Sequence, residues 1–108
     1  MSTAHKYARI ESERRFLLRS LPADLDLQDA MRMIDRYWLG TRLRLRRMET
    51  LDGKVIQLKL TQKYVDPDRP AEETIITNQY LTETEFELFA QLPGPELVKR
   101  RCRYLHLG

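Results

Sequence analysis

Charged and apolar residues alternate one by one in two segments of this 108-residue chain, residues 42–46 and 56–63. Neighbouring side chains on a β-strand point to opposite faces, so each segment predicts a strand with one polar and one apolar face. Asp52-Gly53 lies between the segments and favours a hairpin. The polar face would carry Arg42, Arg44, Arg46, Lys59, Thr61 and Lys63, and the apolar face Leu43, Leu45, Leu58 and Leu60. Clustered cations repel one another, so this pattern favours an anionic ligand on the polar face.

A third segment, residues 6–16, predicts a strand that adds carboxylates to the cations. Glu11 and Glu13 share one face with Arg9 and Arg15. Two carboxylates at this spacing suit a hard divalent cation, and Mg²⁺ commonly combines a few carboxylates with substrate phosphates. Carboxylates for a metal ion and cations for phosphate therefore predict a polyphosphate site.

Composition limits the class of protein. The length fits a single domain over residues 1–108, and 42% hydrophobic residues predict a folded core. A net charge of +3 is compatible with an anionic ligand and does not by itself indicate nucleic acid. Cys102 is the single cysteine, which excludes an intrachain disulfide and a thiolate metal cluster. We find neither a signal peptide nor an apolar stretch of membrane-spanning length, and we expect a cytoplasmic protein without a membrane partner.

The remaining segments predict an α+β fold that is mainly antiparallel β. Residues 31–39 and 73–80 read as strands, and residues 20–29 as a loop. Thr82 and Glu85 predict a capping box at the start of a helix, in which Phe86, Leu88 and Phe89 would pack inward. Pro93-Gly94-Pro95 would end the helix, and residues 96–107 would form a last strand. This strand would carry Lys99 and Arg101 on one face.

Four short motifs follow one another in this chain. They are Glu11-Ser12-Glu13-Arg14-Arg15, an ExExK pattern ending in arginine; Arg42-Leu43-Arg44, a basic strand; Leu60-Thr61-Gln62-Lys63, an LTxK pattern; and Lys99-Arg100-Arg101, a KxR pattern. In this order and spacing the motifs resemble those of the CYTH superfamily, the triphosphate tunnel metalloenzymes. The resemblance covers residues 6–103.

The resemblance implies a fold and an activity. Members form an antiparallel barrel-like tunnel whose charged side chains point inward, so we expect such a barrel, partial or open, with at least one helix packed outside. Metal-dependent hydrolysis of an inorganic, nucleoside or organic triphosphate is the implied activity, as in triphosphatases and class IV adenylate cyclases. Glu11 and Glu13 would bind Mg²⁺ or Mn²⁺, and Arg15 would take the catalytic position. The phosphate ligands would be Arg15, Arg42, Arg44, Lys63, Lys99 and Arg101.

Two departures from the family pattern modify this expectation. Arg15 replaces a lysine, and its planar guanidinium is not equivalent to an ammonium group. The sequence also stops before the acidic strands that complete the family's metal site. We therefore expect an incomplete tunnel, poor turnover, and a homodimer or strand exchange that covers the open edge.

An alternative from another class stays open. The same basic face would suit a non-catalytic module that binds polyphosphate, a nucleotide or a nucleic acid. Tyr37 and Trp38 are not interleaved with the cations as stacking platforms, which disfavours nucleic acid. The sequence does not indicate the organic part of the substrate.

Overall fold

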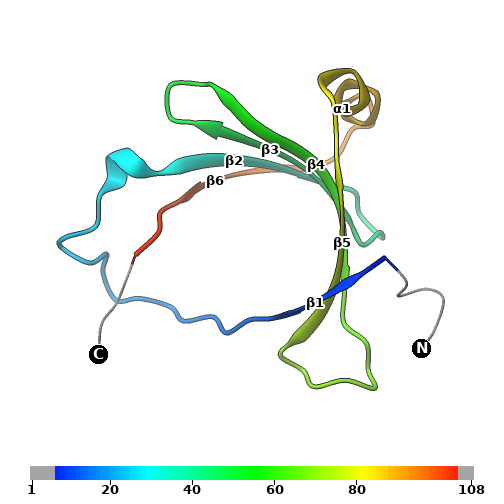
Figure 1. Cartoon of the computed structure of the whole chain (residues 1–108), viewed down its shortest axis with the longest axis horizontal. Helices are drawn as coiled ribbons and strands as arrows, with labels where there is room; N and C mark the ends of the chain where they lie inside the picture. The colour runs from blue at the N-terminus through cyan, green and yellow to red at the C-terminus, as the bar shows by residue number, and fades with distance from the viewer. Residues whose placement is uncertain (1–6, 105–108) are drawn as a thin grey trace.

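The computed structural model describes residues 7–104 as an open, curved antiparallel sheet with one α-helix (Figure 1). The elements are β1 (Arg9–Ser12), the short 3₁₀ helix η2 (Leu27–Asp29), β2 (Met31–Tyr37), β3 (Leu43–Thr50), β4 (Val55–Tyr64), β5 (Glu73–Tyr80), α1 (Glu83–Ala90) and β6 (Glu96–Arg101). The strand order is β1-β5-β4-β3-β2-β6. Figure 1 shows an arc with β1 and β6 at its two edges, and the chain after β1 runs across the open side. The predicted class, mainly antiparallel β with a helix, is confirmed, and the sheet is open.

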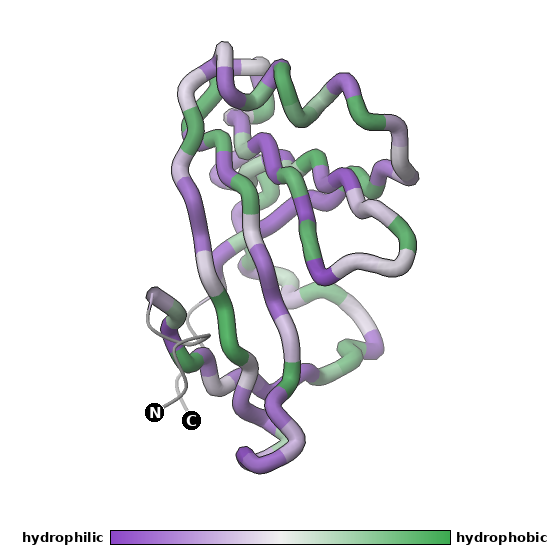
Figure 2. The backbone as a smooth tube through the Cα atoms, turned by 90° about the vertical axis from the view of Figure 1, so that its right-hand side faces the viewer, coloured by the Kyte–Doolittle hydropathy of each residue, from purple (hydrophilic) through white to green (hydrophobic). Residues whose placement is uncertain are grey.

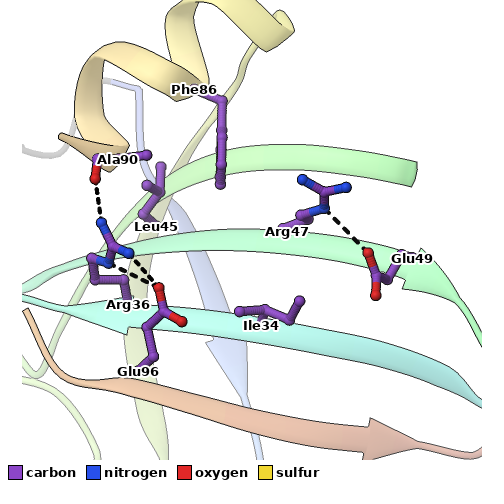
Figure 3. Close-up of a pocket in the computed structure, with 8 residues that line it drawn as sticks. All are labelled: Ile34, Arg36, Leu45, Arg47, Glu49, Phe86, Ala90 and Glu96. Atoms are coloured by element: carbon purple, nitrogen blue, oxygen red, sulfur yellow. Dashed lines mark hydrogen bonds and ion pairs between the residues drawn. The ribbon is translucent and has the colours of Figure 1, made fainter. Parts of the chain in front are cut away.

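Strand register separates the two faces of the sheet as the alternation predicts. Leu45 lies opposite Leu60, whereas Arg46 lies opposite Lys59. Hydrophilic and hydrophobic residues accordingly alternate along the strands (Figure 2). Helix α1 lies outside the arc and contacts β3 and β4 (Figure 1). Its Phe86 side chain points toward the sheet near Leu45 (Figure 3). The apolar hairpin face is therefore convex and partly covered by the helix, and the charged face is concave.

The helix begins as predicted and packs through fewer residues than predicted. The Thr82 hydroxyl accepts from the Glu85 amide at 3.2 Å, and Glu85 accepts in return from the Thr82 amide at 2.9 Å. The helical pattern predicts that Leu88 packs inward, but Leu88 is 63% exposed. The helix has eight residues, and its half-buried apolar residues are Phe86, Phe89 and the last residue, Ala90.

Three strands are shorter than predicted. β1 ends at Ser12, opposite Glu73, because the chain preceding Glu73 leaves the sheet in a loop. β2 ends at Tyr37, after which Gly40 turns the chain with a φ of 77°. β6 ends at Arg101, and the predicted continuation through residues 105–107 lies outside the described residues.

The apolar core is small. Among the described residues, the buried apolar side chains are Ala30, Met33, Leu45, Leu58 and Ile75, and the buried polar ones are Asp35, Arg46, Glu49 and Thr61. The radius of gyration is 16.1 Å, against about 13 Å for an average domain of this length. The large radius reflects the open sheet. The buried polar residues show that polar groups occupy part of the interior that apolar side chains would normally fill.

Candidate functional site

The concave face carries two adjacent rows of polar side chains across the sheet. Register aligns Asp35, Arg46, Lys59 and Tyr80 in one row, and Tyr37, Arg44, Thr61 and Asn78 in the next. The facing residues of β6 include Lys99 and Arg101, opposite Met33 and Met31. Lys63 and Arg9 extend the same face toward β1. We call this set of concave-face cations, Arg9, Arg44, Arg46, Lys59, Lys63, Lys99 and Arg101, the cationic face.

Asp35 is the carboxylate at the centre of the cationic face, and its side chain is fully buried. Arg46 donates two hydrogen bonds to it, at 2.7 and 2.8 Å, and the Lys99 ammonium lies 3.1 Å away. Tyr37 donates to Asp35 at 3.4 Å and accepts from Lys99 at 3.2 Å. Burial alone would raise the pKa of Asp35, but the bonds from Arg46 and Lys99 outweigh it and hold the pKa below its usual value. Asp35 therefore neutralises part of the cluster as an anion.

Arg44 and Lys59 are half-buried cations that form no ion pair with this carboxylate. Arg44 donates to Thr61 at 3.3 Å, while its buried Nε has no hydrogen-bond partner among the described residues. Burial and then Arg46 lower the pKa of Arg44. The pKa of Lys59 is also lowered, by burial first and then by Arg46, Arg44 and Arg101. These shifts indicate a positive potential at this position that an anion would relieve.

A second, mixed cluster lies at the β1 end of the face. The Lys63 ammonium is 3.5 Å from a Glu11 oxygen and 3.6 Å from a Glu13 oxygen. Arg15 is exposed, and its Nε lies 2.7 Å from Glu13. The bond from Arg15, the neighbouring Glu11 and the Lys63 charge together lower the pKa of Glu13 to about 2. The structure thus brings Lys63 together with both glutamates and holds Glu13 as a carboxylate at neutral pH.

Arg42 lies at the margin of the cationic face, where the Lys63 amide donates to the Arg42 carbonyl at 3.1 Å. It lies just before β3, is exposed, and places its guanidinium 4.3 Å from the centre of the Tyr64 ring. Tyr64 pairs with Ile75, on the apolar side of the sheet. Stacking on this ring therefore accounts for the position of Arg42 at the margin of the cationic face. Lys99 and Arg101, in contrast, share the face of Asp35.

The carboxylates fit only one kind of metal site. Across residues 7–104, no group of three or more Asp, Glu, His or Cys side chains is placed to hold a metal ion. Glu11 and Glu13 supply two carboxylates, which suits a divalent cation that completes its shell with phosphate oxygens and water. A metal ion held by protein ligands alone does not fit these residues.

A groove on the convex side has a different chemistry. It has a volume of about 390 Å³ and lies between α1 and strands β2 and β3 (Figure 3). Its charged residues satisfy one another: Arg36 binds Glu96 and the Ala90 carbonyl, and Arg47 binds Glu49 at 3.2 Å. The groove therefore has no charge excess to attract an anion, and the concave face is the better candidate for a functional site.

The sequence alone predicts no individual role for Asp35 or Lys59 in the site. Asp35 has the same parity as Met33 and Tyr37, which predicts that the three share one face of a strand. The alternation does not indicate that Arg46 and Lys99 face it, because strand register and order decide this. The alternation predicts Lys59 on the polar face, but its lack of a carboxylate neighbour also depends on register.

Comparisons with known proteins identify no relative of this chain. No protein-family model, curated protein or solved structure matches it. No helix among residues 7–104 combines the length and apolar character needed to cross a membrane.

Proposed function

We propose that the cationic face binds the triphosphate group of a small molecule together with Mg²⁺ or Mn²⁺, and that this complex is hydrolysed at a phosphoanhydride bond. The observation that carries the proposal is the buried Arg44 Nε without an acceptor. An unsatisfied buried donor destabilises a protein by about 1–3 kcal/mol. A phosphate oxygen beside Arg44 would satisfy the donor and reduce the repulsion with Arg46 and Lys59.

Each part of the face has a role in this proposal. Arg44, Lys63, Lys99 and Arg101 hold phosphate oxygens, and Glu11 and Glu13 hold the metal ion that arrives with the substrate. The metal ion supplies neutralisation of charge on the phosphate oxygens. Arg15, fixed by Glu13, orients the terminal phosphate. The cations stabilise the charge that develops on the leaving oxygen.

The family resemblance supports this proposal, and the open sheet modifies it. A curved antiparallel sheet with charged residues inside and a helix outside is the arrangement that the CYTH resemblance implies. Edges β1 and β6 have no further strand beside them among the described residues. We include in the proposal that a second copy pairs along these edges and encloses the site. The cytoplasmic location expected from the sequence stays a prediction.

A non-catalytic polyphosphate or nucleotide-binding module is the second candidate. It is favoured by the ammonium of Lys63, which lies within 3.6 Å of both glutamates and competes with a metal ion for them. In such a module the phosphate would bind to the same cations, and Glu11 and Glu13 would serve to position Lys63.

Binding is tested by calorimetric titration of inorganic triphosphate with and without Mg²⁺. Arg44→Ala should weaken binding about ten-fold, as expected for the loss of a charge-assisted contact. Arg47→Ala is the matched control, because it removes an arginine of the same strand from the convex face. Equal losses in the two variants would show that net charge, and not the concave site, determines affinity.

Hydrolysis is tested by phosphate release from triphosphate in Mg²⁺ or Mn²⁺. A catalytic domain should release phosphate in a metal-dependent way, and Glu13→Gln should abolish release without abolishing binding. A rate per chain that rises with protein concentration, together with a dimer on sizing, would support completion of the site by a second copy. Tight binding without metal-dependent release would favour the non-catalytic module.

A further inference from the structure

Lys59 is placed unlike the other lysines in the described chain. It is half-buried on β4, opposite Arg46, and has no hydrogen-bond or ion-pair partner within residues 7–104. Lys63 contacts Glu11 and Glu13, Lys99 contacts Asp35, and Lys54 is exposed in the β3–β4 turn. Lys59 is thus the lysine of the concave face that no carboxylate holds in its protonated form.

The groups around Lys59 are mainly cations. Arg46 lies opposite it on β3, Arg44 lies two residues along the same strand, and Tyr80 is its neighbour on β5. The charge of Arg101 on β6 also acts on Lys59. Burial and these arginines lower the pKa of Lys59, and the more distant Asp35 opposes them only weakly. At neutral pH the neutral amine, which is the nucleophilic form, is therefore a larger fraction of Lys59 than of a lysine with the ordinary pKa.

We propose that Lys59 is an acylation site that reacts selectively with small acyl phosphates. This inference rests on the proposed binding of phosphate by the cationic face. Arg44, whose buried Nε has no acceptor among the described residues, would hold the phosphate group of the reagent, and its carbonyl carbon would lie beside the Lys59 nitrogen. Selectivity arises because the arginines that disfavour the ammonium form also attract the phosphate.

The reaction is balanced without another reactant. The lone pair of the neutral Lys59 amine attacks the carbonyl carbon, and a C–N bond forms. The C–O bond to phosphate breaks, and inorganic phosphate leaves with the bonding electron pair. The amine proton passes to water, and the product is an amide.

Acylation would change the function of the face. The amide carries no charge, so it removes one cation that faces the bound anion. Triphosphate affinity should fall several-fold, as for the loss of a charged contact at a partly buried site. An abundant acyl phosphate would thereby lower phosphate binding by this domain.

The test is incubation of the folded 108-residue chain with acetyl phosphate, followed by mass spectrometry of each lysine over time. Lys59 should acquire acetyl groups about ten-fold faster than Lys54, although Lys54 is more exposed. Acetic anhydride, which has no phosphate, is the matched reagent and should show a much smaller preference. Triphosphate should protect Lys59 from acetyl phosphate and leave Lys54 unaffected.

Two results would overturn the inference. One is a Lys59 rate equal to or below that of Lys54, and the other is the same Lys59 preference with acetic anhydride as with acetyl phosphate. Failure of the proposed function is distinguishable: if acetyl phosphate selects Lys59 but triphosphate neither binds nor protects, the triphosphate proposal falls and the acylation site stands. If triphosphate binds by calorimetry but Lys59 is not selected, the acylation proposal alone falls.

Discussion

Replacing Asp35 by asparagine should destabilise the protein strongly, because it removes the charge that compensates the buried Arg46. Removing one partner of a buried ion pair costs about 3–5 kcal/mol. The Lys99 side chain beside Asp35 is 40% exposed, so water reaches one side of the cluster. We therefore expect the lower end of this range, about 3 kcal/mol, as the loss in free energy of unfolding at neutral pH.

Urea denaturation of wild type and Asp35→Asn measures this loss. Glu49→Gln is the matched control, since Glu49 is also buried and also binds arginines. Its partners Arg32 and Arg47 are 36% and 38% exposed, so water can solvate them, and we expect a loss of about 1 kcal/mol. If Asp35→Asn folds too poorly to measure, the double variant Asp35→Asn/Arg46→Met should recover stability, because it removes both charges.

The pH dependence provides an independent check. The pKa of Asp35 is lower in the folded than in the unfolded protein. Its contribution is therefore complete above the unfolded value, about 3.9, and is lost as the pH falls through the folded value. The difference between wild type and Asp35→Asn should shrink in acid. A loss below 1 kcal/mol, a loss equal to that of Glu49→Gln, or a difference that does not change in acid would refute this account of the ion cluster.

Three further predictions concern single residues. Thr82→Ala removes the cap of α1 and should lower the free energy of unfolding by about 1 kcal/mol, while Thr84→Ala, inside the same helix, should change it little. Gly94→Ala would place a methyl group 2.3 Å from the Tyr37 carbonyl oxygen, so it should destabilise the start of β6 by about 1–3 kcal/mol; an unchanged urea midpoint would contradict the close approach of these two backbone segments. The pKa of Glu13 is lowered to about 2, so the contribution of its contacts with Lys63 and Arg15 is complete above its unfolded pKa, about 4.3, and is lost as the pH falls toward 2. Glu13→Gln should flatten this part of the stability–pH profile at low salt. Because Glu13 is exposed, salt screens its contacts, and the two profiles should coincide at high salt.

Much of the fold was predictable because it depends on local pattern. Alternation placed β3 and β4 and separated Arg44 from Leu45, Asp-Gly placed the hairpin, and Thr82 with Glu85 placed the start of α1. Strand ends were less predictable. β1 stops where β5 begins to diverge from it, which depends on a segment about sixty residues away in sequence.

The site was predictable as a face and not as a set of contacts. Parity put Arg44 and Lys63 on one side, but the partner of each cation depends on strand order. β6 returns beside β2 and not beside β5, which places Lys99 at Asp35. Arg42 stacks on the Tyr64 ring, a contact between residues of different parity that alternation cannot indicate.

The small apolar core has a consequence for the response of the protein to temperature. Unfolding raises the heat capacity mainly through the exposure of apolar surface, and a typical domain of this length gains about 1.3–1.6 kcal/mol/K. Few apolar side chains here pass from a buried state to water, and the exposure of buried Asp35, Arg46 and Thr61 lowers the heat capacity. The heat-capacity change should lie below this range. The free energy of unfolding would then vary gently with temperature, and calorimetry should give a broad, shallow stability curve.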